Sequence, residues 1–243
     1  MAIIKKWINK IIGGNLKEFE HSDFMKPKFN EIKNSGDCKT DVKYKIAMFF
    51  ENQFSVEAKK KKYDKEWMLH YCINKAWIDA TISERFKKDS EIIKNKKEII
   101  CFLENQILNN QCEICDNFYQ WHNSICERSV HNMRYGVWQK LINMTFKYLY
   151  CIESVFPEYS DVWCSCHCPI DTIISKQIYN KLKEKNIAAP ELIISKKISK
   201  SDRDINWNNI TKDDYLKLQN QIRLICKDLD ICPIEFDFLY WEK

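Results

Sequence analysis

The sequence predicts a mostly α-helical fold, and three observations lead to this prediction. Only four glycines and five prolines occur in 243 residues, whereas the many tight turns of an all-β protein usually need more of both. Apolar residues make up 45% of the chain, which is ordinary for a globular protein and excludes wholesale disorder. These residues recur at helical spacing in several segments. We expect one helical domain over 1–243, or two helical lobes over about 1–110 and 111–243 with a cleft between them.

The N-terminal half contains several segments with this spacing. Residues 3–12 alternate Ile and Trp with lysines, which predicts an amphipathic helix that Gly13 ends. This helix either packs onto the rest of the protein or lies on a membrane surface. Residues 15–40 are polar and predict a loop, and 42–57 are ambiguous. The spacing then predicts three helices, over 63–86, 91–108 and 112–133.

The clearest helix of the C-terminal half covers 140–152. Its apolar residues form a single stripe that we expect to be buried, consisting of Leu141, Met144, Tyr148, Leu149 and Ile152. A loop over 157–168 and a helix over 172–182 follow. Residues 190–209 are charged and irregular, and Thr211 begins another helix with a capping box. The aromatic tail over 232–241 is expected to pack back onto the core.

Charge and hydropathy limit the environment and the partners. The net charge of +5 is compatible with a polyanionic partner but does not require one. No stretch approaches the roughly 20 apolar residues of a membrane span, and residues 1–6 lack the pattern of a signal peptide. We therefore expect a soluble cytoplasmic protein with no membrane partner, whose twelve cysteines are reduced thiols.

Two cysteine groups raise the question of a metal. Cys112 and Cys115 form one pair, and Cys164, Cys166, His167 and Cys168 form a second group. Together they offer enough sulfur and nitrogen ligands for zinc, but the second group lacks the usual gap between ligands. We expect no metal and no cofactor, with scattered buried thiols as the preferred interpretation. A zinc-stabilised interaction module stays open as an alternative.

A lysine at the start of a helix is the most informative feature. A helix is expected to end near Met133, a turn containing Gly136 follows, and a new helix opens with Lys140 in its first turn. Unpaired amide groups at such a turn suit a phosphate. The positive field of a helix N-terminus, with partial burial, is expected to lower the pKa of Lys140. A neutral lysine amine is a nucleophile that can form a Schiff base.

An aspartate stands at the start of the following helix. Asp171 is followed by Thr172, and it lies 31 positions after Lys140, so a helix and a loop separate the two. An antiparallel return of the chain would bring them together. The carboxylate is either a helix N-cap or a base and electrostatic partner for a developing cation.

These two segments resemble a known family. Gly136-Val137-Trp138-Gln139-Lys140 is similar to the end of the helix-hairpin-helix motif of the 8-oxoguanine DNA glycosylases, including the archaeal type. Pro169-Ile170-Asp171-Thr172 is similar to the family's Pro-Val-Asp-Thr segment. The resemblance covers about fifty of the 243 residues and implies a helical glycosylase fold of the helix-hairpin-helix superfamily.

The resemblance implies a base-excision hydrolase that flips its target base out of the helix. Lys140 would attack the sugar C1′ atom, and Asp171 would activate it and stabilise the oxocarbenium-like transition state. A Schiff base could then permit strand cleavage. Lys147 lies on nearly the same helix face and is an alternative nucleophile. The sequence departs from the family at Trp138, where the second hairpin glycine would stand, and at Arg134-Tyr135, where the family has Leu-Pro.

Further residues are expected to contact DNA, either a duplex with a flipped base or a single strand. The predicted DNA-binding residues are Arg134, Tyr135, Gly136, Val137, Trp138, Gln139 and Asn143. The predicted base pocket contains Trp163, His167 and Trp207.

Two alternatives concern the function. The divergent hairpin suggests a specialised substrate, such as a modified base in foreign DNA, which would make the protein an antiviral enzyme. The other alternative is a non-catalytic nucleic-acid-binding protein that keeps the hairpin only as a phosphate clamp.

Overall fold

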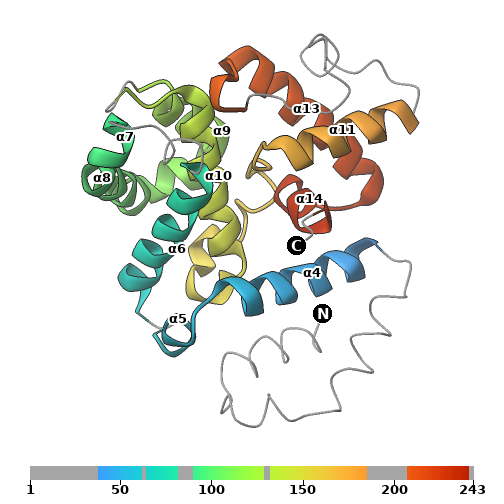
Figure 1. Cartoon of the computed structure of the whole chain (residues 1–243). Helices are drawn as coiled ribbons and strands as arrows, with labels where there is room; N and C mark the ends of the chain where they lie inside the picture. Colours follow the sequence, from blue (N-terminus) through green and yellow to red (C-terminus); the bar gives the residue numbers. More distant parts are fainter. Residues whose placement is uncertain (1–37, 62–63, 82–89, 129–131, 185–206, 241–243) are drawn as a thin grey trace, which may run out of the picture.

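The computed structural model describes residues 38–61, 64–81, 90–128, 132–184 and 207–240. Within these ranges the chain forms α-helices and short 3₁₀ helices and no β-strand (Figure 1). This confirms the predicted mostly α-helical class. The amphipathic helix predicted over 3–12 and most of the irregular segment predicted over 190–209 lie outside the described residues.

Helices account for most of both halves of the described chain. In chain order, the N-terminal part contains α4 (Cys38–Gln53), α5 (Val56–Lys60), α6 (Lys65–Ala80), α7 (Glu91–Lys94), α8 (Lys96–Asn109) and α9 (Gln111–Cys126). The C-terminal part contains α10 (Tyr135–Tyr150), η2 (Glu153–Val155), η3 (Pro157–Tyr159), α11 (Thr172–Glu184), η4 (Trp207–Asn209), α13 (Lys212–Leu229) and α14 (Pro233–Tyr240).

Two predicted helix boundaries near the hairpin are wrong. The helix α9 ends at Cys126 rather than near Met133, and α10 begins at Tyr135. Lys140 therefore lies in the second turn of its helix and not in the first. The carbonyl of Arg134 accepts hydrogen bonds from the amides of Val137 and Trp138, at 3.0 and 3.1 Å. These amides are thus already paired within the protein.

The helix α10 lies in the middle of the molecule (Figure 1). Every residue from Gly136 to Leu149 is buried, because α6 and α9 pack on one side and η4 and α13 on others. The predicted apolar stripe is buried, but the opposite face of the helix is buried as well. That face carries polar side chains, namely Gln139, Lys140, Asn143 and Lys147.

The buried apolar residues form two clusters. The larger one extends from Phe49 to Cys166 and also takes in Ile234 and Phe238 from α14. The smaller one contains residues of α11, α13 and α14 together with Cys168 and Ile170. A boundary near residue 110 would fall inside the larger cluster. The polar face of α10 contacts the loop over 166–170, where the larger cluster ends and the smaller one begins.

Gly136 is explained by a close approach of the backbone. A Cβ atom at this position would lie 2.1 Å from the carbonyl oxygen of Trp207 and 2.8 Å from the backbone of Asn208. The resemblance to the glycosylase hairpin assigns such an approach to a DNA phosphate. In the structure the neighbouring backbone is η4 of the same chain, so the glycine allows η4 to pack against the start of α10.

We predict that Gly136→Ala destabilises the protein by about 3 kcal/mol, the upper part of the usual range for overpacking, because both clashing groups are backbone. Urea denaturation followed by circular dichroism measures this change. The control Lys176→Ala, at an exposed position of α11, should change the stability by less than about 0.5 kcal/mol. A Gly136→Ala protein as stable as the control would contradict the packing of η4 on α10.

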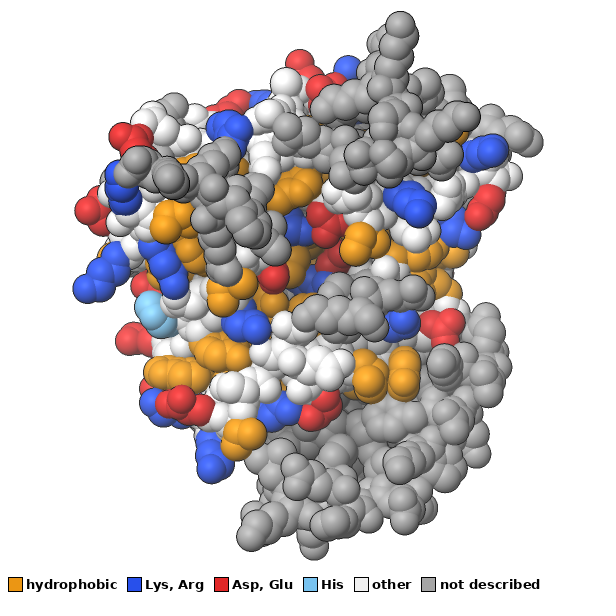
Figure 2. Space-filling view, in the orientation of Figure 1, with side chains coloured by type: hydrophobic (Ala, Val, Ile, Leu, Met, Phe, Trp, Pro, Cys, Tyr) orange, Lys and Arg blue, Asp and Glu red, His pale blue; other side chains and the backbone are white. Residues whose placement is uncertain are grey.

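The surface gives two further observations. Among the described residues, no helix combines the length and the apolar character needed to pass through a bilayer. Figure 2 shows lysine and arginine side chains distributed over one face of the molecule and interspersed with acidic ones.

Candidate active site

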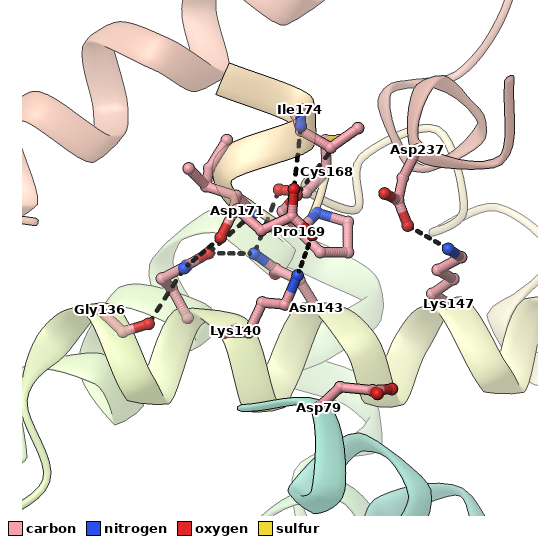
Figure 3. A network of polar contacts seen from close by, with 12 residues as sticks. Asp79, Gly136, Lys140, Asn143, Lys147, Cys168, Pro169, Asp171, Ile174 and Asp237 are labelled. Atoms are coloured by element: carbon pink, nitrogen blue, oxygen red, sulfur yellow. Dashed lines mark hydrogen bonds and ion pairs between the residues drawn. The ribbon is translucent and has the colours of Figure 1, made fainter. Parts of the chain in front are cut away.

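The structure brings Lys140 and Asp171 into direct contact. The Lys140 Nζ atom lies 2.8 Å from the Asp171 Oδ2 atom (Figure 3). Lys140 comes from the second turn of α10, and Asp171 immediately precedes α11. The Lys140 side chain is 6% exposed and the Asp171 side chain 27%, so Asp171 is the member of the pair that solvent reaches.

Asp171 caps a helix with one carboxylate oxygen and contacts Lys140 with the other. Its Oδ1 atom accepts a hydrogen bond from the amide of Ile174 at 2.9 Å, which caps the N-terminus of α11. Its Oδ2 atom accepts from Lys140. The cap fixes the carboxylate relative to the helix, so the oxygen that faces Lys140 has little freedom to turn away.

The loop before Asp171 is held by side-chain amides and a guanidinium. Gln139 donates to the carbonyl of Ile170 at 3.3 Å and accepts from its amide at 3.4 Å. Gln219 of α13 forms the same two-way contact with the backbone of Cys168, at 2.6 and 3.1 Å. Arg223 donates to the carbonyls of Cys164 and Ser165. These bonds to the backbone, of which those at Cys168 and Ile170 are buried, position Asp171 through the loop that carries it.

Each member of the Lys140–Asp171 pair stabilises the charged form of the other. Burial alone would lower the pKa of Lys140, but the carboxylates of Asp171, Asp237 and Asp79 together outweigh burial and raise this pKa above its ordinary value. Burial would raise the pKa of Asp171, and the Lys140 ammonium with the Ile174 amide lowers it instead. The expectation of a lowered lysine pKa is therefore wrong for this conformation. The amine is protonated because the Asp171 carboxylate lies in direct contact with it.

A second ion pair lies further along α10. Lys147 contacts Asp237 of α14, and the two side chains are 1% and 6% exposed (Figure 3). The Lys147 ammonium also lies over the rings of Phe49 and Phe238, 4.2 and 4.7 Å from their centroids. Lys147 is thus enclosed by its own protein, and its role as an alternative nucleophile stays a prediction. It joins α10 to the C-terminal helix.

A separate chain of buried polar groups begins on the same face of α10. Asn143 donates to the Gln139 Oε1 atom at 3.1 Å and to the Tyr215 hydroxyl at 2.8 Å. The Tyr215 hydroxyl lies 2.7 Å from His167 Nδ1 and 3.4 Å from His122 Nε2. Both histidines are fully buried. Burial lowers the pKa of His122 to about 3, and burial and the adjacent His122 lower the pKa of His167.

We predict that acid destabilises the fold through these histidines. Their folded-state pKa values lie below the unfolded value of about 6.5, so the unfolded chain binds more protons below that pH. The stability they contribute is complete above about pH 6.5 and falls with decreasing pH, by at most about 1.4 kcal/mol per histidine per pH unit.

Urea midpoints between pH 7 and pH 5 measure this dependence. His122→Gln should reduce the slope by about half, since one of the two buried histidines remains. The control Lys176→Ala, at an exposed position of α11, should leave the slope unchanged. A wild-type protein whose stability is flat over this range would contradict the buried neutral histidines.

Most of the predicted DNA-binding residues lie inside the protein. Gly136, Val137, Trp138, Gln139 and Asn143 are buried, so none of them presents a surface to DNA in this conformation. The reason is that α10 is covered on all sides, which its single apolar stripe did not indicate. Arg134 and Tyr135 are half-buried. Arg134 donates to Asn209 and Tyr135 to Asn123, and their contact with DNA stays a prediction.

The predicted base-pocket residues divide in the same way. Trp163 is 4% exposed and His167 is fully buried, so both belong to the interior and cannot stack on a base in this conformation. Trp207 is partly exposed, and the Lys140 Nζ atom lies 5.9 Å from the centroid of its ring. The structure therefore brings one predicted aromatic residue to the Lys140–Asp171 pair.

Sequence reasoning missed the partners that come from distant helices. Asp237, Tyr215 and Gln219 lie 48 to 93 positions from the residues they contact, and no local spacing relates them. Asp237 does carry a signal that could have been used. It stands between Phe236 and Phe238 in an apolar segment, and a carboxylate in such a place is expected to have a buried partner.

The cysteines correct one expectation. A disulfide joins Cys164 to Cys232, while the other ten cysteines form no disulfide. The prediction that all twelve are thiols is therefore wrong, because the fold brings together two cysteines 68 positions apart. In the part of the chain that the structure describes, no group of three or more His, Cys, Asp or Glu side chains could hold a metal ion.

Comparisons with known proteins give no relative. The chain matches no protein-family model, no curated protein and no solved structure.

Proposed function

We propose that this protein is a DNA glycosylase that excises a damaged or modified base, with Lys140 as nucleophile and Asp171 as its acidic partner. The observation that carries the proposal is the 2.8 Å contact between the two side chains. The resemblance of the two sequence segments to the 8-oxoguanine DNA glycosylases names the same two residues. The contact adds that the lysine and the acid belong to one site.

The chemistry requires a proton to move within this pair. Lys140 is an ammonium beside Asp171, and it becomes a nucleophile when the carboxylate takes its proton. Exclusion of water by a bound nucleotide favours this transfer, because a low dielectric disfavours both charges. The amine then attacks C1′, the C1′–N bond breaks, and the electron pair leaves with the base. The base receives the proton from Asp171, whose restored charge stabilises the cationic sugar.

One feature of the surroundings supports this assignment. Trp207 lies beside Lys140 and is partly exposed, which suits stacking on an extruded base.

Release of a free base is the direct test. The purified full-length chain is incubated with single-stranded and duplex DNA that carries oxidised, deaminated or alkylated bases, and with phage DNA that contains naturally modified bases. Mass spectrometry identifies free bases, and an abasic-site probe detects the sugar left behind. We expect one class of base to be released in equal amount with abasic sites. Release from phage DNA alone would support a defence role, whereas no release from any of these DNAs would contradict the proposal.

A further inference from the structure

The Cys164–Cys232 disulfide borders a pocket of about 380 Å³, away from the Lys140–Asp171 pair. Cys164 is exposed and Cys232 partly buried. Cys232 immediately precedes α14, and Cys164 lies in the loop that leads to Asp171. A disulfide that solvent reaches in this way is open to attack by a thiolate.

The surroundings of the two sulfur atoms differ. Cys232 stands at the N-cap position of α14, where its amide donates to the Glu235 carboxylate at 2.8 Å and its carbonyl accepts from the Glu235 amide at 2.9 Å. A thiolate at a helix N-terminus is stabilised, which makes Cys232 the better leaving group. Glu235 opposes this effect, but the pocket is also lined by three lysines, Lys39, Lys43 and Lys227. Cys164, as the more exposed sulfur, is the one attacked.

A third cysteine at the pocket does not supply the attacking thiolate. Cys226 lines the pocket and is a free thiol. Burial raises its pKa to about 12, so it stays protonated and unreactive near neutral pH. A thiol that opens the disulfide therefore has to come from outside the protein.

The charge of the pocket indicates the kind of thiol. Asp230 is paired with Lys39, and the Glu235 carboxylate is occupied by the Tyr150 hydroxyl and the Cys232 amide. With the residues that the structure describes, Lys43 and Lys227 form no ion pair. Their ammonium groups are thus available to a ligand with carboxylates.

We propose that the Cys164–Cys232 disulfide is a thiol–disulfide exchange site for a small thiol that carries carboxylates. The external thiolate attacks the Cys164 sulfur and forms a mixed disulfide. The Cys164–Cys232 bond breaks, and its electron pair stays on the Cys232 sulfur, which takes a proton from water. The Cys232 thiolate reverses the exchange when it attacks the Cys164 sulfur and re-forms the original bond. A second external thiol completes the exchange when it releases Cys164 from the mixed disulfide. This site is independent of the proposed base excision, and its test does not use that activity.

The first measurement asks whether the disulfide exists and exchanges. The purified full-length chain is alkylated under denaturing conditions without reductant and mapped by mass spectrometry. We expect a peptide that links Cys164 to Cys232, and we expect glutathione to remove this link faster than cysteamine, which is cationic. Twelve alkylated thiols, also after mild oxidation, would overturn the proposal.

The second measurement captures the mixed disulfide. Cys232→Ser protein is treated with oxidised glutathione or with cystamine, and the rate of attachment at Cys164 is compared with that at exposed Cys101 of α8. Glutathione should be favoured at Cys164, and Lys43→Gln with Lys227→Gln should reduce this preference on the order of threefold to tenfold. Cys101 is the internal control and should not respond to these changes.

The proposal would be overturned if the preference of Cys164 for glutathione did not depend on the two lysines. It would also be overturned if both reagents modified Cys164 and Cys101 equally. If Cys232→Ser does not fold, the glutathione-to-cysteamine ratio is measured instead on chains with both cysteines, with and without the two lysine substitutions. That comparison uses no cysteine variant. A ratio that the lysine substitutions reduce supports the proposal, and a ratio that they leave unchanged overturns it.

Discussion

Lys140→Gln is expected to lower the rate of base release by at least about 10³-fold, because glutamine can neither attack C1′ nor exchange a proton with Asp171. Asp171→Asn should lower it by about 10²-fold to 10⁴-fold, since the amide accepts no proton and carries no charge to stabilise the sugar. Single-turnover rates on the base identified by mass spectrometry provide the measurement.

The control for this prediction is Lys181→Gln. Lys181 belongs to α11, the helix that Asp171 caps, and it is paired with Glu184. This variant removes one positive charge and one ion pair from the last turn of the same helix without touching the reacting groups, so it should retain near-normal activity. Circular dichroism establishes that all three variants are folded. If Lys140→Gln were as active as Lys181→Gln, Lys140 would not be the nucleophile.

The second large effect concerns stability, at the buried pair of Lys147 and Asp237. Lys147→Met should destabilise the fold by about 3–5 kcal/mol, because it leaves a buried carboxylate without its partner. Burial raises the pKa of Asp237 even though Lys147 opposes this rise. The added substitution Asp237→Leu should therefore recover most of the loss. Urea denaturation of the two single variants and the double variant gives the coupling between the residues.

Lys61→Met serves as the control for the buried pair. Lys61 and Glu57 form an ion pair on the surface, at 3.5 Å with side chains 48% and 67% exposed. Removal of an exposed pair typically changes stability by less than about 1 kcal/mol. A Lys147→Met protein that behaved like this control would show that the pair does not hold α14 to α10.

The sequence predicts the fold well where apolar spacing is regular. The stripe on α10 and the helices α6, α8 and α13 follow from local spacing, since each has one face that packs on a neighbour. The helix α4 was missed because its buried residues Val42, Phe49 and Phe50 are few and its polar residues are not confined to one side. Its packing against α14 comes from a segment about two hundred positions away, which the local pattern does not contain.

The candidate site was predicted only in part, again because some of its contacts join segments that are distant in the sequence. The Lys140–Asp171 contact could be expected because both residues open or nearly open helices that follow each other in the chain. The burial of Gln139, Asn143 and Lys147 could not be expected, since it depends on partners in the loop before α11, in α13 and in α14. The polar face of α10 suggested an outer surface, but it meets the C-terminal helices instead.

The central claim is that the Lys140 amine forms a covalent bond with the sugar, and borohydride trapping on DNA with a preformed abasic site tests it most directly. This substrate bypasses the need to know the target base, because the open sugar presents the aldehyde that an amine attacks. We predict a stable adduct whose peptide map places the DNA on Lys140, and no such adduct with Lys140→Gln. No adduct with the wild-type chain, or one spread over surface lysines and unaffected by Lys140→Gln, would contradict the claim.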